Sequence, residues 1–135
     1  MDKPVRSMRN PNPAVVDYGE LKGLIESNQK FAPSDIDGIC ERNGHFLIME
    51  WKRPKTDDYE GEEVSYGQQR LLQALAAKEG FIVIIVRGHT DNNKMTVEKF
   101  FRVQPKGECL PLGVGVEMFK AFYKQWYELA DGYKK

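Results

Sequence analysis

The sequence feature that most constrains the fold is the pair Asn43-Gly44, which separates two segments of mixed apolar and charged residues. Asn-Gly strongly favours a type I′ turn, because both central residues of that turn need a positive φ. The flanking segments, Ile36 to Glu41 and Phe46 to Lys52, are therefore predicted to be the two strands of a hairpin. With a two-residue turn, Arg42 pairs with His45, and the register of the rest follows.

Counting outward from the turn places Asp37 opposite Glu50. Side chains alternate along a strand, so Asp35, Asp37, Glu50 and Lys52 are expected on one face. Opposed residues have Cβ atoms ~4.5–5.5 Å apart, and two carboxylates at that spacing repel each other unless a cation or a proton relieves them. The pattern predicts a divalent-metal site. The backbone carbonyl of Trp51 is a further oxygen ligand for Mg²⁺ in this prediction, and Mn²⁺ is expected to substitute.

Lys52 is expected beside this metal, where a lysine can orient or deprotonate an attacking water and stabilise charge that develops on a phosphate. The alternative interpretation of these residues is an exposed hairpin face whose cross-strand ion pairs each contribute little to stability. Asp37 opposite Glu50 argues against that alternative, since like charges are the wrong pairing for it.

Periodicity and capping residues predict the remaining elements. The continuous apolar run from Phe81 to Val86 indicates a central strand that is covered on both faces. The other predicted elements are a helix from Pro13 to about Ile25, a helix from Ser65 to about Glu79, a strand from Thr96 to Val103, and a helix from Val116 to Leu129 with Phe119, Phe122, Tyr123 and Trp126 inside. The expected fold class is α/β: a mixed central sheet flanked by helices, with an α-β-β-α-β core extended by one strand and a C-terminal helix.

The charge balance excludes some classes of function. The 135 residues contain 20 Lys+Arg and 20 Asp+Glu, which argues against a strongly basic nucleic-acid coat or a polybasic membrane binder. Length and 41% hydrophobic content suit one domain over residues 1–135. The longest apolar run is too short to cross a bilayer, so we expect a cytoplasmic protein, with Cys40 and Cys109 as free thiols.

Two segments fall outside the predicted elements. Residues 1–12 hold basic residues among prolines and are expected to form an irregular basic arm. Residues 53–64 hold Pro54, Gly61 and five acids, and are expected to form a mobile acidic loop. The candidates for contacts with nucleic-acid phosphates are Arg6, Arg9, Arg53 and Lys55, and the alternative for each is a solvated loop position.

Two motifs carry a resemblance to a known family. Asp37 on the first hairpin strand, followed by Glu50-Trp51-Lys52 on the second, resembles the acid and acid-x-lysine motif of the PD-(D/E)XK nuclease superfamily. Ser65-Tyr66-Gly67-Gln68 resembles the serine-x-x-glutamine helix start of virus-type replication-repair nucleases and Holliday junction resolvases. The resemblance spans roughly residues 14 to 87.

The resemblance implies a restriction-endonuclease-like fold and a Mg²⁺-dependent DNA nuclease without an organic cofactor. It implies that Asp37 and Glu50 hold the metal, that Lys52 and Gln68 are catalytic, and that Glu20 is an additional acid near the metal. A structure-selective endonuclease for branched or duplex DNA in replication, recombination or repair is expected, as a homodimer if both strands are cut. The resemblance also implies a prokaryotic or virus-infected cell as the setting.

Several alternatives remain open at this point. Asp35 competes with Asp37, Asp17 or Glu26 with Glu20, and Gln69 with Gln68. The alternative function is a non-catalytic adaptor that binds nucleic acid or protein on a nuclease fold.

Overall fold

The computed structural model describes residues 16–133, and the chain divides between Ser34 and Asp35 into two compact units. The basic arm predicted for residues 1–12, with Arg6 and Arg9, lies outside the described residues. The described part of the first unit, residues 16–34, has one short 3₁₀ helix, η1 (Gly19–Leu21). The second unit contains β1 (Gly38–Arg42), β2 (His45–Lys52), α1 (Tyr66–Ala76), β3 (Phe81–Asp91), β4 (Lys94–Val103), β5 (Cys109–Val114) and α2 (Gly115–Asp131).

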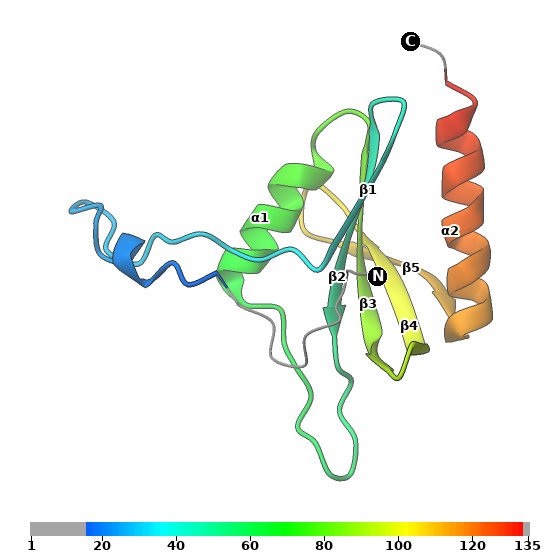
Figure 1. Cartoon of the computed structure of the whole chain (residues 1–135), viewed down its shortest axis with the longest axis horizontal. Helices are drawn as coiled ribbons and strands as arrows, with labels where there is room; N and C mark the ends of the chain where they lie inside the picture. Colours follow the sequence, from blue (N-terminus) through cyan, green and yellow to red (C-terminus); the bar gives the residue numbers. More distant parts are fainter. Residues whose placement is uncertain (1–15, 134–135) are drawn as a thin grey trace, which may run out of the picture. The chain divides into compact units, whose positions relative to one another are not determined.

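The second unit is built on a five-stranded mixed sheet with the strand order β1-β2-β3-β4-β5. Strands β2 and β3 are parallel and are joined through α1, whereas the other neighbouring strands are antiparallel. Figure 1 shows this sheet with α1 on one face and α2 on the other. The predicted α/β class, with a mixed central sheet between helices, is confirmed.

The hairpin forms with the predicted register. Arg42 pairs with His45, and the ladder continues to Gly38 opposite Met49. Asn43 and Gly44 have φ values of 52° and 82°, as a type I′ turn requires. Because β1 begins at Gly38, Asp37 lies one residue before the strand, next to the end of β2.

The sheet carries a separate apolar cluster on each face. On the α2 face, Leu47 and Ile84 pack with Phe100, Phe119 and Trp126. On the α1 face, the cluster consists of Ile48, Leu72, Val83, Ile85 and Val103. The predicted central strand is confirmed, because β3 lies in the middle of the sheet and its residues Val83 to Val86 are buried from both faces.

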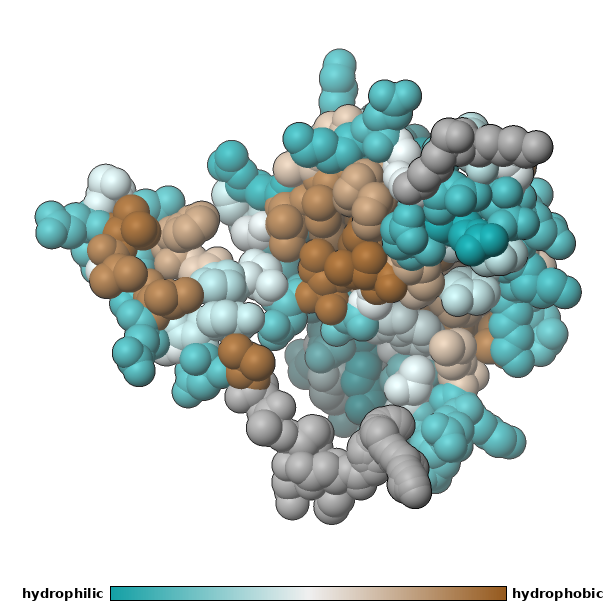
Figure 2. Space-filling model, turned by 45° about the horizontal axis from the view of Figure 1, so that its top comes forward, coloured by the Kyte–Doolittle hydropathy of each residue, from teal (hydrophilic) through white to brown (hydrophobic). Residues whose placement is uncertain are grey.

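The helix predicted from Pro13 to Ile25 is wrong over its described part, residues 16–25, where η1 is the only helical turn. Gly23 has a φ of +74°, outside the right-handed helical region. The apolar residues whose helical spacing suggested a helix face are not buried: Tyr18 and Leu21 are each 43% exposed and Ile25 is 44% exposed. Apolar side chains of this kind appear brown at the surface in Figure 2. Without a buried stripe, a glycine-interrupted segment gains too little to hold a helix.

Strand β5 was not predicted, since Pro111 and Gly113 interrupt its sequence. Its position explains this: β5 is an edge strand, where a proline needs no hydrogen-bond partner for its nitrogen, and the ladder with β4 shifts between Phe100 and Phe101. Tyr123 was predicted inside but is 43% exposed on α2. Cys40 and Cys109 are free thiols. No helix among the described residues is long and apolar enough to cross a membrane.

Candidate active site

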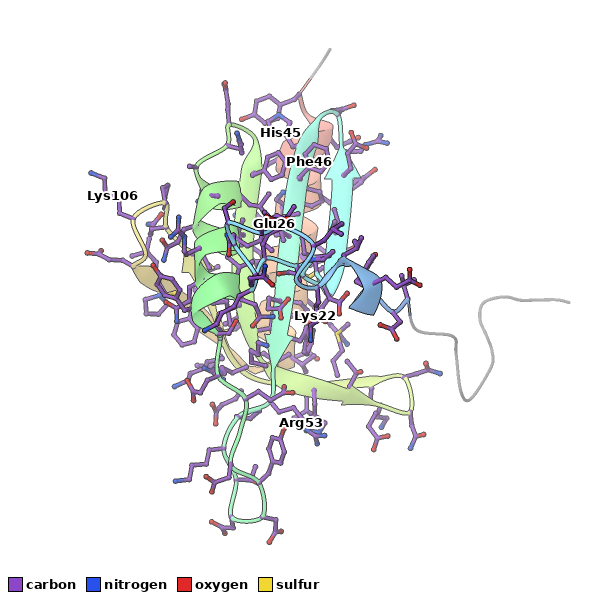
Figure 3. All side chains as sticks on the ribbon, turned by 90° about the vertical axis from the view of Figure 1, so that its left-hand side faces the viewer. Lys22, Glu26, His45, Phe46, Arg53 and Lys106 are labelled. Atoms are coloured by element: carbon purple, nitrogen blue, oxygen red, sulfur yellow. The ribbon has the colours of Figure 1, made fainter. Side chains whose placement is uncertain are left out.

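The candidate active site lies where β2 ends and α1 begins. Figure 3 shows Arg53 at this end of β2, at the start of the 53–64 loop, and His45 and Phe46 at the opposite, turn end of the hairpin. Glu50, near the end of β2, is 4% exposed and is the one buried polar or charged residue in the described part of the chain. A buried carboxylate needs charged or hydrogen-bonding partners, because desolvation otherwise costs several kcal/mol.

Two side chains contact the Glu50 carboxylate. The Gln68 amide nitrogen Nε2 donates to Oε2 of Glu50 at 3.0 Å. The Lys52 ammonium lies 3.3 Å from the same oxygen. Lys52 comes from β2 and Gln68 from the first turn of α1, so the strand and the helix together hold this carboxylate.

Asp37 joins the cluster through the backbone. Its Oδ2 accepts a hydrogen bond from the Trp51 N–H at 2.8 Å, which ties the residue before β1 to the segment between Glu50 and Lys52. The hydrogen bond uses the Trp51 N–H, so it links Asp37, one of the predicted acidic ligands, to the residue whose carbonyl is the predicted backbone ligand. Among the described residues, no hydrogen bond or ion pair joins Asp35 to this cluster, so the geometry favours Asp37 over Asp35.

The pKa of the Glu50 carboxyl is raised above its ordinary value. Burial is the main cause, because it penalises the charged form, and the charge of Asp37 adds to the effect. The Lys52 ammonium and the Asp37 backbone N–H lower the same pKa in part. Burial and the charge of Asp37 therefore both disfavour the ionised form of Glu50. A cation bound beside the carboxylate would offset both effects.

The capping of α1 orients Gln68. Ser65 caps the helix and accepts from the Gln68 backbone N–H at 3.2 Å, while the Gln68 side-chain oxygen accepts from the Ser65 N–H at 3.3 Å. This capping box leaves the amide nitrogen of Gln68 directed at Glu50. Gln69 instead donates to the Val64 carbonyl at 3.0 Å, so Gln68 is the glutamine that reaches the site.

The remaining predicted residues belong to other segments of the chain. Glu20 is in η1, on the first unit, and its role as a ligand stays a prediction. The Arg53 guanidinium lies 5.3 Å from the centre of the Tyr59 ring, and its backbone N–H donates to Glu62 at the base of the 53–64 loop. Lys55 is exposed on that loop. Arg6 and Arg9 lie outside the described residues.

Sequence reasoning missed two cations on the same face of the sheet. Arg87 pairs with Lys52 in the parallel ladder, and Lys99 pairs with Arg87 in the next ladder. Alternation after the buried run could have assigned Arg87 to the face of Val83 and Ile85. Its position beside Lys52 required the parallel register, which no local turn determines.

The donor atoms suit a hard cation. Carboxylate and carbonyl oxygens are the ligands that Mg²⁺ prefers, and Asp37, Glu50 and Trp51 offer both kinds. Within the described residues there is no group of three or more His, Cys, Asp or Glu side chains placed to hold a metal ion. Mg²⁺ commonly uses one or two carboxylates and keeps several waters, so a two-carboxylate site is compatible with it.

The chain was compared with protein families, with curated proteins and with solved structures, and none of them matches it.

Proposed function

We propose that this chain is a Mg²⁺-dependent DNA nuclease on a restriction-endonuclease-like core, acting as a structure-selective endonuclease. The observation that carries the proposal is the buried Glu50 carboxylate, which contacts Lys52 and Gln68 and lies beside Asp37. These are the four residues that resemble the acid, acid-x-lysine and serine-x-x-glutamine motifs. They come from three separate segments of the chain, so their meeting is a property of the fold.

Each residue has a distinct role in the proposal. Asp37, Glu50 and the Trp51 carbonyl hold Mg²⁺, which supplies a water of lowered pKa and charge stabilisation at the phosphate. Lys52 orients the attacking water and neutralises charge that develops on the phosphate oxygens. Gln68 fixes the position of the Glu50 carboxylate. Water attacks the phosphorus and the bond to one ester oxygen breaks, which leaves a phosphate on one product and a hydroxyl on the other.

The test is a cleavage panel with labelled duplex, single-stranded, flap and four-way DNA in the presence of Mg²⁺ or Mn²⁺. Lys52→Ala is expected to lower the cleavage rate by roughly 10²–10³-fold, the usual range for loss of a group that stabilises developing charge. Asp37→Asn is expected to lower the rate as well, because it weakens the proposed metal site. Asp35→Asn is the matched control, because it removes an acid two residues away from Asp37 that makes no hydrogen bond to Glu50 or Trp51.

Equal cleavage by wild type and Asp37→Asn would overturn the proposal. Calorimetry with Mg²⁺ provides a second test that does not depend on finding the substrate. The wild type should bind the ion and Asp37→Asn should bind it more weakly. DNA binding without metal binding or cleavage would instead favour the adaptor function.

A further inference from the structure

A concave region lies on the α1 face of the sheet, next to the candidate active site. It is a cavity of about 330 Å³ between α1 and strands β3 to β5. This volume is at the small end of the ~300–1,000 Å³ range of ligand pockets, which suits a ligand of one or two rings. Its lining includes the apolar residues Leu72, Ile85, Phe101 and Val103 and, among its polar residues, Gln73 and Arg87.

A row of three cations connects this cavity to the candidate active site. Lys52, Arg87 and Lys99 occupy paired positions on β2, β3 and β4 and share the α1 face. Adjacent strands are ~4.8 Å apart, so the row crosses about 10 Å of the sheet. Lys52 contacts Glu50 at one end, and Lys99 lies 5.7 Å from the centre of the Phe101 ring at the other. Arg87, in the middle, lines the cavity.

Arg87 is held in place by groups that an anion can replace. Its guanidinium donates to the Glu62 carbonyl and lies 3.8 Å from the Glu63 carboxylate. The Glu63 side chain is 90% exposed, so its ion pair with Arg87 contributes little and is easily exchanged. A phosphate diester presents the same charge as this carboxylate, and arginine binds phosphate oxygens through two parallel hydrogen bonds.

We propose that this cavity binds one unpaired nucleotide of a DNA strand, with the base against Phe101 and the phosphate on Arg87. An aromatic ring beside a cationic groove is the usual arrangement for binding unpaired bases, because every base has a face that stacks. Gln73 at the rim makes no side-chain hydrogen bond among the described residues, and its amide can pair with a base edge. The adjacent phosphate on the strand then reaches Lys52. This site rests on the proposed function, since the bound strand would be the nuclease substrate.

The experiment measures binding without cleavage. Fluorescence anisotropy is recorded in EDTA with a short labelled single strand, a blunt duplex of the same sequence and a free deoxynucleoside monophosphate. Phe101→Leu keeps the cavity lining apolar and should weaken single-strand binding about 5- to 150-fold, with little effect on the duplex. Arg87→Gln should lower the slope of log affinity against log salt for the single strand by about 0.7, the value for one phosphate contact.

Two further variants separate this role from a structural one. Glu63→Gln removes the exposed competitor for Arg87 and should raise single-strand affinity about 2-fold, whereas a merely damaged fold would lower it. Arg102→Gln is the matched control, because alternation along β4 places Arg102 on the opposite face from Phe101, and its binding should equal that of the wild type.

Unchanged single-strand binding in Phe101→Leu and Arg87→Gln would overturn the proposal, as would an equal loss on the single strand and the duplex. Binding of the free monophosphate as tightly as the strand would also overturn it, because a strand site gains from neighbouring phosphates. The outcome is independent of catalysis. If the variants alter binding while no DNA is ever cleaved, the nucleotide site stands and the nuclease proposal fails; cleavage with unaltered binding gives the reverse result.

Discussion

Replacing Lys52 with methionine tests whether the ionised Glu50 carboxylate destabilises the folded state when its cationic partner is absent. The two charged groups are 3.3 Å apart, and their side chains are 14% and 6% exposed. At an effective dielectric constant of about 20, two unit charges at this separation attract each other by about 5 kcal/mol. Removing one partner of a buried pair costs ~3–5 kcal/mol, because the other charge is left without compensation.

Without Lys52, Glu50 can take up a proton instead of staying charged. The loss of unfolding free energy therefore cannot exceed the cost of protonating Glu50, which depends on pH. Keeping a carboxyl protonated costs about 1.36 kcal/mol for each pH unit above its ordinary pKa, which for Glu50 is 4.5. The loss of unfolding free energy in Lys52→Met is therefore limited to about 4 kcal/mol at pH 7.5 and about 1.4 kcal/mol at pH 5.5. Lys52→Met should lose about 3–4 kcal/mol of unfolding free energy at pH 7.5, and no more than about 1.4 kcal/mol at pH 5.5.

The sign follows from the raised pKa of Glu50. The folded state holds the proton more tightly than the unfolded state, so the unfolding free energy falls as the pH rises from the ordinary pKa toward the folded-state pKa. Removing Lys52 removes a group that lowers this pKa, which widens the pH range over which stability falls. The variant should therefore be most unstable in neutral and alkaline solution.

Urea denaturation in EDTA, at the two pH values, provides the measurement. Four proteins complete a double-mutant cycle: the wild type, Lys52→Met, Glu50→Gln and the double variant. The double variant should recover most of the loss, because replacing both members of a buried pair is often neutral or stabilising. An equal loss for Lys52→Met at both pH values, or a double variant as unstable as Lys52→Met, would refute the reasoning.

Three other substitutions test the structure around the site. Ser65→Ala should lower the free energy of unfolding by about 1 kcal/mol through loss of the α1 cap. It should also slow cleavage, because Gln68 loses its fixed position. A loss of stability with no change in the cleavage rate would contradict the role given to Gln68. Gly88→Ala should destabilise the sheet strongly in urea titrations, because the added Cβ would lie only 2.1 Å from the Thr96 carbonyl oxygen, and wild-type stability would show that β3 and β4 do not approach so closely. Leu72→Ala should cost ~2–5 kcal/mol by the same assay, since Leu72 is 2% exposed in the α1-face cluster, and a loss below that range would mean that α1 packs loosely.

The parts of the site that follow from local signals could be predicted from the sequence. The Asn43-Gly44 turn determines the hairpin register, and that register brings Asp37 close to the end of β2. The Ser65 capping signal places Gln68 in the first turn of α1, but the choice between Gln68 and Gln69 needed the structure, in which Gln68 contacts Glu50. Each of these inferences depends only on a few neighbouring residues and on the repeat period of a strand or a helix.

The remaining parts depend on contacts between distant segments. The pairing of Arg87 with Lys52 results from how α1 packs on the sheet, since a parallel pair has no turn to set its register. Strand β5 forms because β4 offers it an edge, although Pro111 argues against a strand locally. The first predicted helix failed for the opposite reason: its spacing was helical, but none of residues 16–34 is buried, and no packing supports it.

The location of the polar cluster bears on why the chain carries it. On the α1 face, β2 and β3 are apolar at Ile48, Val83 and Ile85, and change to charged residues only at their carboxyl ends. Ligands of open α/β sheets bind at the carboxyl ends of parallel strands, where the strand ends and the following loops meet. Apolar residues at Glu50 and Lys52 would extend the α1-face cluster and avoid the cost of a desolvated charge. Stability alone therefore does not account for the buried carboxylate, whereas the proposed binding of a cation at this edge of the sheet would account for it.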